Sequence, residues 1–182
     1  MMRGPQASQQ LTKRQEQMRK SVRTCARIVT HIDLFRTLAN APIKDSETIL
    51  FIRDAIVSIA MLEFTAILEQ EGGRRYTKCG LTKDDLEALW TSNMSGLAYD
   101  QYLIDIKSIR DKAIAHQDHF RDKLHVPDLE PMLSFAVNLH VHLVALCDSQ
   151  SIVLDSRRDL PGLRSHMSRE ACELVRKLTN DA

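Results

Sequence analysis

The stretch that decides the fold lies between residues 49 and 68 and reads ILFIRDAIVSIAMLEFTAIL. Its hydrophobic residues fall on nearly all sides of a helix, which is typical of a helix surrounded by others. Asp45 or Ser46 can cap the start of this helix, and Gly72-Gly73 predicts its end near Glu71. We therefore expect a central helix around which the rest of the chain packs.

Helical spacing of apolar residues continues on both sides of this stretch. Aromatic residues make up only 5% of the chain, whereas good helix formers dominate, so the composition disfavours strands. The further predicted helices span residues 11–37, 82–93, 97–120, 132–147 and 168–178. Residues 82–85 resemble a capping box, with Asp85 in place of the usual Glu or Gln. The sequence thus predicts an all-α protein.

The length of 182 residues suits one domain covering residues 1–182. We expect residues 1–8 to form a frayed tail and residues 149–166, which contain Pro161-Gly162, to connect to the C-terminal helix. The four cysteines are far apart, with no metal-binding or disulfide pattern, which indicates reduced thiols. No secretion signal or long uncharged apolar run is evident, so a cytoplasmic protein without a membrane partner is expected.

The net charge of +1 does not by itself indicate a polyanion-binding protein. The N-terminal region is nevertheless basic, and Lys13, Lys20, Arg23 and Arg27 fall opposite the apolar side of the first predicted helix. These residues are candidate nucleic-acid contacts through phosphates. The alternative is an ordinary solvated face.

One motif carries candidate chemistry: residues 109–118 read IRDKAIAHQD, late in the predicted helix over residues 97–120. On a helix, Arg110 and His116 lie about 120° apart and border one apolar face. The alternative is that Arg110, Asp111 and His116 are ordinary polar residues of an amphipathic helix.

This motif resembles the Arg-polar-x4-His motif of the HEPN superfamily, most closely its abortive-infection branch of U type. The resemblance implies an antiparallel bundle with a four-to-five-helix core. It also implies a homodimer that places two motifs across a shared cleft and, in many members, a metal-independent endoribonuclease of toxin or phage-defence type. An antitoxin or nucleotidyltransferase partner is a further implication. Asp118 stands where some members carry a tyrosine used by that transferase, so control through a tyrosine is not expected.

By this resemblance the catalytic candidates are Arg110, His116 and Asp111, and RNA is the candidate substrate. An imidazole can take a proton from a ribose 2′-hydroxyl near neutral pH, and a permanently charged guanidinium can stabilise a phosphorane. Asp111 would orient one of the other two side chains, and Lys112 would contact nucleic acid. No cofactor is expected. His116 and His119 lack a third ligand at diagnostic spacing, so no metal is expected.

Two other functions remain open at this stage. The chain can be a non-catalytic HEPN-like module that binds nucleotide or RNA or acts as a regulatory subunit. It can also be a structural helical domain whose apolar motif face is a dimer interface.

Overall fold

The computed structural model describes residues 12–42, 46–68, 75–91, 98–115, 128–155 and 158–180. The expected tail at residues 1–8 and the expected helix end at Gly72-Gly73 lie outside these ranges. The described residues form helices without a strand, which confirms the all-α prediction. The helices are α1 (Lys13–Ala39), α2 (Glu47–Leu68), α3 (Arg75–Lys78), α4 (Lys83–Thr91), α5 (Tyr99–Ala115), α6 (Glu130–Ser149) and α7 (Leu160–Asn180).

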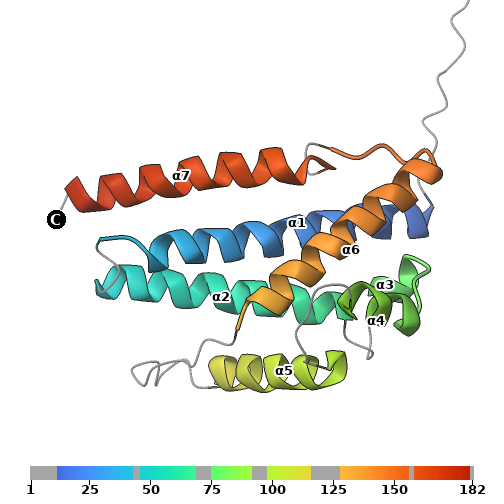
Figure 1. Cartoon of the computed structure of the whole chain (residues 1–182), viewed down its shortest axis with the longest axis horizontal. Helices are drawn as coiled ribbons and strands as arrows, with labels where there is room; N and C mark the ends of the chain where they lie inside the picture. The colour runs from blue at the N-terminus through green and yellow to red at the C-terminus, as the bar shows by residue number, and fades with distance from the viewer. Residues whose placement is uncertain are drawn as a thin grey trace, which may run out of the picture.

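Helix α1 is the element against which α2, α6 and α7 pack (Figure 1). It begins with a capping box: the Gln15 amide donates to the Thr12 hydroxyl over 3.2 Å, and the Thr12 amide donates to the Gln15 side chain over 2.8 Å. One side of α1 is fully buried, as the sequence predicted, through Met18, Cys25 and Val29. Helix α1 therefore occupies the central position expected for residues 49–68.

Helix α2 runs antiparallel to α1 and α5 runs antiparallel to α2 (Figure 1). Of the two predicted capping residues, Ser46 caps α2, because its hydroxyl accepts from the Ile49 amide over 3.4 Å, and Asp45 lies outside the described residues. Burial on all sides was predicted for this helix but does not hold: Phe51 is 76% exposed, Ile59 43% and Leu62 41%. Among the described elements, α1, α3 and α5 pack against α2, and these helices leave the side that carries Phe51, Ile59 and Leu62 exposed.

An aromatic cluster joins α2, α4, α5 and α6 at one end of the bundle. Phe64 of α2 meets Tyr102 of α5 and Phe135 of α6 edge-on, with ring centroids 6.1 and 5.8 Å apart. Trp90 of α4 packs against Tyr99 and Phe135. Edge-to-face contacts of this kind add to the stabilisation that comes from burial alone.

The capping box predicted at the start of α4 is confirmed. The Asp85 amide donates to the Thr82 hydroxyl over 3.2 Å, and the Thr82 amide donates to the Asp85 carboxylate over 2.7 Å. The Thr82 amide and the Thr82 hydroxyl both donate to the Asp85 carboxylate, and these two hydrogen bonds lower its pKa. A carboxylate one carbon shorter than Glu therefore completes the reciprocal cap.

Helix α7 begins at Leu160, within the segment predicted as a connection over residues 149–166. Proline is compatible with the first turn of a helix, where no partner is needed for its missing N–H, so Pro161 does not prevent this start. The Gly162 amide donates to the Asp159 carboxylate over 3.1 Å, which caps the turn. The predicted boundary was wrong because Pro161-Gly162 was interpreted as a break rather than as a helix start.

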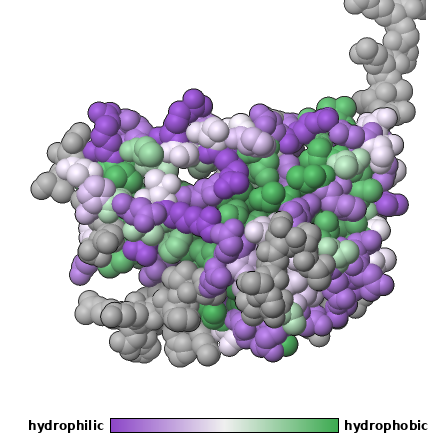
Figure 2. Space-filling model, viewed as in Figure 1, coloured by the Kyte–Doolittle hydropathy of each residue, from purple (hydrophilic) through white to green (hydrophobic). Residues whose placement is uncertain are grey.

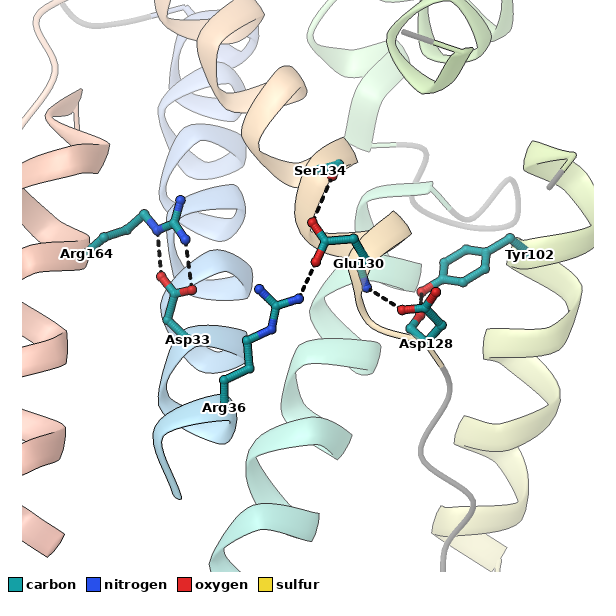
Figure 3. A network of polar contacts seen from close by, with 7 residues as sticks. All are labelled: Asp33, Arg36, Tyr102, Asp128, Glu130, Ser134 and Arg164. Carbon is teal, nitrogen blue, oxygen red and sulfur yellow. Dashed lines mark hydrogen bonds and ion pairs between the residues drawn. The ribbon is translucent and has the colours of Figure 1, made fainter. Parts of the chain in front are cut away.

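Polar contacts tie α7, α1, α6 and α5 together (Figure 3). Arg164 of α7 donates to both oxygens of Asp33 on α1, over 2.6 and 2.9 Å. Arg36, one turn further along α1, pairs with Glu130 at the start of α6. The Tyr102 hydroxyl of α5 donates to the Asp128 carbonyl over 2.8 Å, just before α6.

Among the described residues, α6 is the one helix long and apolar enough to cross a bilayer by length and composition alone. It packs against α1 and α4 and buries a row of side chains that includes Met132, Leu139 and Leu143. These are the features of a core helix. In the space-filling view, hydrophobic residues gather where α6 lies over α1, and hydrophilic residues are frequent along α7 (Figure 2).

Candidate functional site

Arg110 of the sequence motif lies at the contact between α5 and α2. Its Nη1 donates to the Thr65 hydroxyl of α2 over 3.0 Å. Its Nε donates to Asp111 Oδ1 over 2.8 Å, and its Nη2 lies 2.8 Å from the same oxygen. The Arg110 side chain is only 17% exposed, whereas that of Asp111 is 64% exposed. The guanidinium is thus held by a buried hydroxyl on one side and an exposed carboxylate on the other.

Thr65 was not among the residues singled out from the sequence. It is almost fully buried, and its hydroxyl donates to the Met61 carbonyl one turn back over 2.9 Å while accepting from Arg110. The available signal was a polar residue on an otherwise apolar helix face, where a buried hydroxyl needs a partner. Nothing local to residues 49–68 indicates that the partner is Arg110, which is far away in sequence.

The second half of the motif is not placed by the structure. His116 lies outside the described residues, as do Asp118 and His119, and the side chain of Lys112 is not described either. The structure therefore brings Arg110 and Asp111 together and says nothing of their distance from His116.

Most of the candidate nucleic-acid contacts on α1 have acidic neighbours. Lys20 Nζ lies 2.7 Å from Glu16, Arg23 Nη2 lies 2.9 Å from Asp155 of the segment after α6, and Arg27 Nε lies 2.6 Å from Glu63 of α2. Lys13 is exposed in the first turn of α1. These acidic neighbours offset part of the positive charge that the sequence pattern indicated. This face of α1 is therefore less positively charged than its number of Lys and Arg residues suggests.

Glu63 is one of three charged residues within the apolar stretch over residues 49–68, which lies within α2. Its carboxylate pairs with Arg27, and its other oxygen lies 3.6 Å from His31 Nδ1 on α1. Arg53 lies over the ring of Phe35, 5.2 Å from the centroid. These two charged side chains are thus engaged with α1, as expected for charges on an otherwise apolar helix.

The buried cysteines are poor nucleophiles. Cys25, Cys79 and Cys147 are buried, and burial raises the pKa of each thiol. Cys79 contacts the Ser21 hydroxyl over 3.3 Å. Within the described ranges, no group of three or more His, Cys, Asp or Glu side chains is arranged to hold a metal ion.

The outward side of α2 carries an uncharged apolar strip formed by Phe51, Ala55, Ile59 and Leu62. Residues spaced by three and four positions lie on one face of a helix, so these four side chains form a continuous row. The row ends one turn before Thr65, the residue that holds Arg110. The candidate site and the apolar strip therefore share one helix.

No protein-family model, curated protein or solved structure matches this chain. The class that fold and sequence establish is an all-helical protein built on α1 and the helices packed against it.

Proposed function

We propose that the protein is a metal-independent endoribonuclease of HEPN type that acts through Arg110 and His116. The observation that carries the proposal is the state of Arg110: a cation on the motif helix, largely withdrawn from solvent and fixed in position from a second helix. A pre-positioned guanidinium stabilises developing negative charge without having to be ordered during the reaction. An ordinary surface arginine does not have this property.

In the proposed reaction, His116 removes the proton of a ribose 2′-hydroxyl, and the resulting oxygen attacks the adjacent phosphorus. Arg110 stabilises the phosphorane, after which the 5′-oxygen leaves and takes up a proton from water, and a 2′,3′-cyclic phosphate remains. Histidine suits the first role because its pKa is ordinarily close to neutral pH. Arginine suits the second because it remains charged and binds phosphate oxygens in pairs.

The proposal includes a homodimer, in keeping with the family resemblance. The apolar strip on α2 supports it, because a row of exposed, uncharged side chains can pack against a second copy without charge repulsion. A contact there would lie next to Thr65 and hence close to Arg110. An antitoxin or nucleotidyltransferase partner belongs to the same proposal, as does a cytoplasmic location.

The same strip favours a second candidate function, a non-catalytic helical dimerisation domain. In that case Arg110 would be an interior polar contact between α5 and α2, and no RNA would be cleaved. Both candidate functions require a dimer, but only the endoribonuclease cleaves RNA.

The test is cleavage of a structured RNA in EDTA by the wild type, Arg110→Ala and His116→Ala. We expect the wild type to cleave, and each variant to lose roughly a hundredfold or more in rate. Matched controls are Arg176→Ala and His166→Ala, which remove exposed residues of the same types from α7. Wild-type turnover that survives both motif substitutions contradicts the proposed site, and absence of turnover in the wild type favours the dimerisation domain.

A further inference from the structure

The contact between Arg110 and Asp111 has a property that the motif alone does not reveal. Residues adjacent on a helix point about 100° apart, so neighbouring side chains do not ordinarily face each other. Here the Arg110 side chain nevertheless brings both Nε and Nη2 to 2.8 Å from Asp111 Oδ1. The contact is therefore a specific arrangement of the guanidinium and not an automatic result of sequence adjacency.

The edge of the guanidinium formed by Nε and Nη2 is one of the edges through which arginine binds a phosphate or carboxylate in a bidentate manner. In this structure Asp111 occupies that edge with an anionic oxygen. A phosphate approaching the same edge would have to replace the carboxylate, since two anions cannot share one pair of N–H donors. Asp111 thus occupies one of the edges of this guanidinium at which a phosphate oxygen can bind.

Thr65 and Asp111, as partners of Arg110, differ in how easily they can be replaced. Thr65 is buried, and its hydroxyl is fixed by the Met61 carbonyl. Asp111 is 64% exposed, and exposed ion pairs are weak and screened by salt. Displacement of Asp111 would leave the contact from Nη1 to Thr65 in place, so the guanidinium would keep its position while its partner changed.

We propose that Asp111 is a built-in competitor for the phosphate-binding edge of Arg110, so that an RNA phosphate binds by displacing the Asp111 carboxylate. This inference rests on the proposed function for the identity of the ligand. It gives Asp111 a role in regulating access to the site. Thr65 becomes the positioning residue that keeps Arg110 oriented during the exchange.

The test is titration of the full chain with inorganic phosphate at about 0.15 M salt, where charge effects beyond about 8 Å are screened. The readout is the NMR signal of the Arg110 Nε–H group, assigned by its loss in Arg110→Lys. We expect Asp111→Asn to bind phosphate roughly three- to fivefold more tightly than the wild type, because a weak exposed pair has been removed. Asp105→Asn removes an exposed carboxylate of the same helix that accepts from Gln101 and should change the affinity less than twofold.

Several results would overturn the proposal. These are equal tightening in Asp111→Asn and Asp105→Asn, weaker binding in Asp111→Asn, or no response of the Arg110 signal to phosphate in any variant. Equal tightening would show a general charge effect, and weaker binding would show that Asp111 positions Arg110 instead of competing for it. RNA cleavage is scored separately: specific tightening without turnover in any protein supports the competition and contradicts the nuclease.

Discussion

The Thr65 hydroxyl of α2 accepts a hydrogen bond from Arg110 Nη1 of α5 over 3.0 Å, and this contact links the core of the bundle to the motif. Because the Thr65 hydroxyl donates its proton within α2, with the Met61 carbonyl at 2.9 Å and the Leu62 carbonyl at 3.2 Å, its oxygen is oriented to accept from Arg110. The position of the guanidinium is therefore set by the packing of α5 on α2.

Replacement of Thr65 by valine should show the strength of this link. The substitution removes the hydroxyl and leaves an N–H group of a largely buried arginine without this acceptor, so the free energy of unfolding should fall by about 1–3 kcal/mol. In an Arg110→Met background the loss should be smaller by about 1 kcal/mol. Urea unfolding of the four proteins in this cycle measures the difference.

Thr30→Val is the matched control for the Thr65 experiment. Thr30 is also buried on a helix, and its hydroxyl donates to the Arg27 carbonyl over 3.0 Å, so valine removes a similar backbone contact. Thr30→Val should lower the free energy of unfolding by the same amount in the wild-type and the Arg110→Met backgrounds. Equal losses for Thr65→Val in both backgrounds would show that the hydroxyl does not hold the guanidinium.

The apolar strip on α2 predicts how the chain associates. Burying a phenylalanine or leucine side chain is worth about 1.5–3 kcal/mol, so Phe51→Ser or Leu62→Ser should raise the dimer dissociation constant roughly ten- to a hundredfold. Val141→Ser on α6, where the wild-type side chain is 61% exposed, should leave it unchanged. Sedimentation equilibrium measures the constants, and a monomeric wild type or unaffected strip variants would rule out this interface.

The partly buried carboxyl of Asp54 predicts a dependence of stability on pH. Burial raises its pKa, and Arg53 opposes the change. A raised pKa means that the unfolded chain releases this proton first as pH rises, so Asp54 lowers stability progressively above about pH 4. Asp54→Asn should therefore raise Tm by about 1–3 °C at pH 7 and give no gain at pH 3. A gain of the same size at both pH values would contradict this origin.

The ion pair between Asp33 and Arg164 predicts how α7 is attached to α1. Both guanidinium contacts are short, and Asp33 raises the pKa of Arg164. The pair is partly exposed, so a double-mutant cycle with Asp33→Asn and Arg164→Gln should give a coupling of about 1 kcal/mol that decreases with salt. If the pair between Asp33 and Arg164 attaches α7 to α1, breaking it should also lower the resistance of α7 to proteolysis. Breaking the pair between Arg176 and Glu173, which lies within α7, should leave that resistance unchanged. A coupling near zero would mean that apolar contacts alone hold α7.

Much of the helical arrangement follows from local sequence, and the departures have physical causes. Capping residues such as Ser46 and Thr82 were recognisable because their partners lie within one turn. The start of α7 was missed because Pro161 ends one helix as readily as it begins another. The exposed side of α2 was missed because the hydrophobicity of a side chain indicates that it favours burial, but does not indicate whether another part of the chain packs against it.

The candidate site was predictable only in part. The motif identified Arg110 and Asp111 as neighbours, but not that Asp111 would take the Nε edge of the guanidinium. Thr65 and Glu63 acquire their partners through tertiary packing, which no spacing along the chain encodes. His116 remains a prediction from the motif, because it lies outside the described residues.

The most direct test of the central claim uses two RNAs of the same sequence, one unmodified and one carrying 2′-O-methyl groups at every position, each incubated with the wild type in EDTA. The proposed chemistry requires a free 2′-hydroxyl, so only the unmodified RNA should be cut, with 2′,3′-cyclic phosphate ends. No cleavage of the unmodified RNA, or cleavage of both RNAs, would contradict the account.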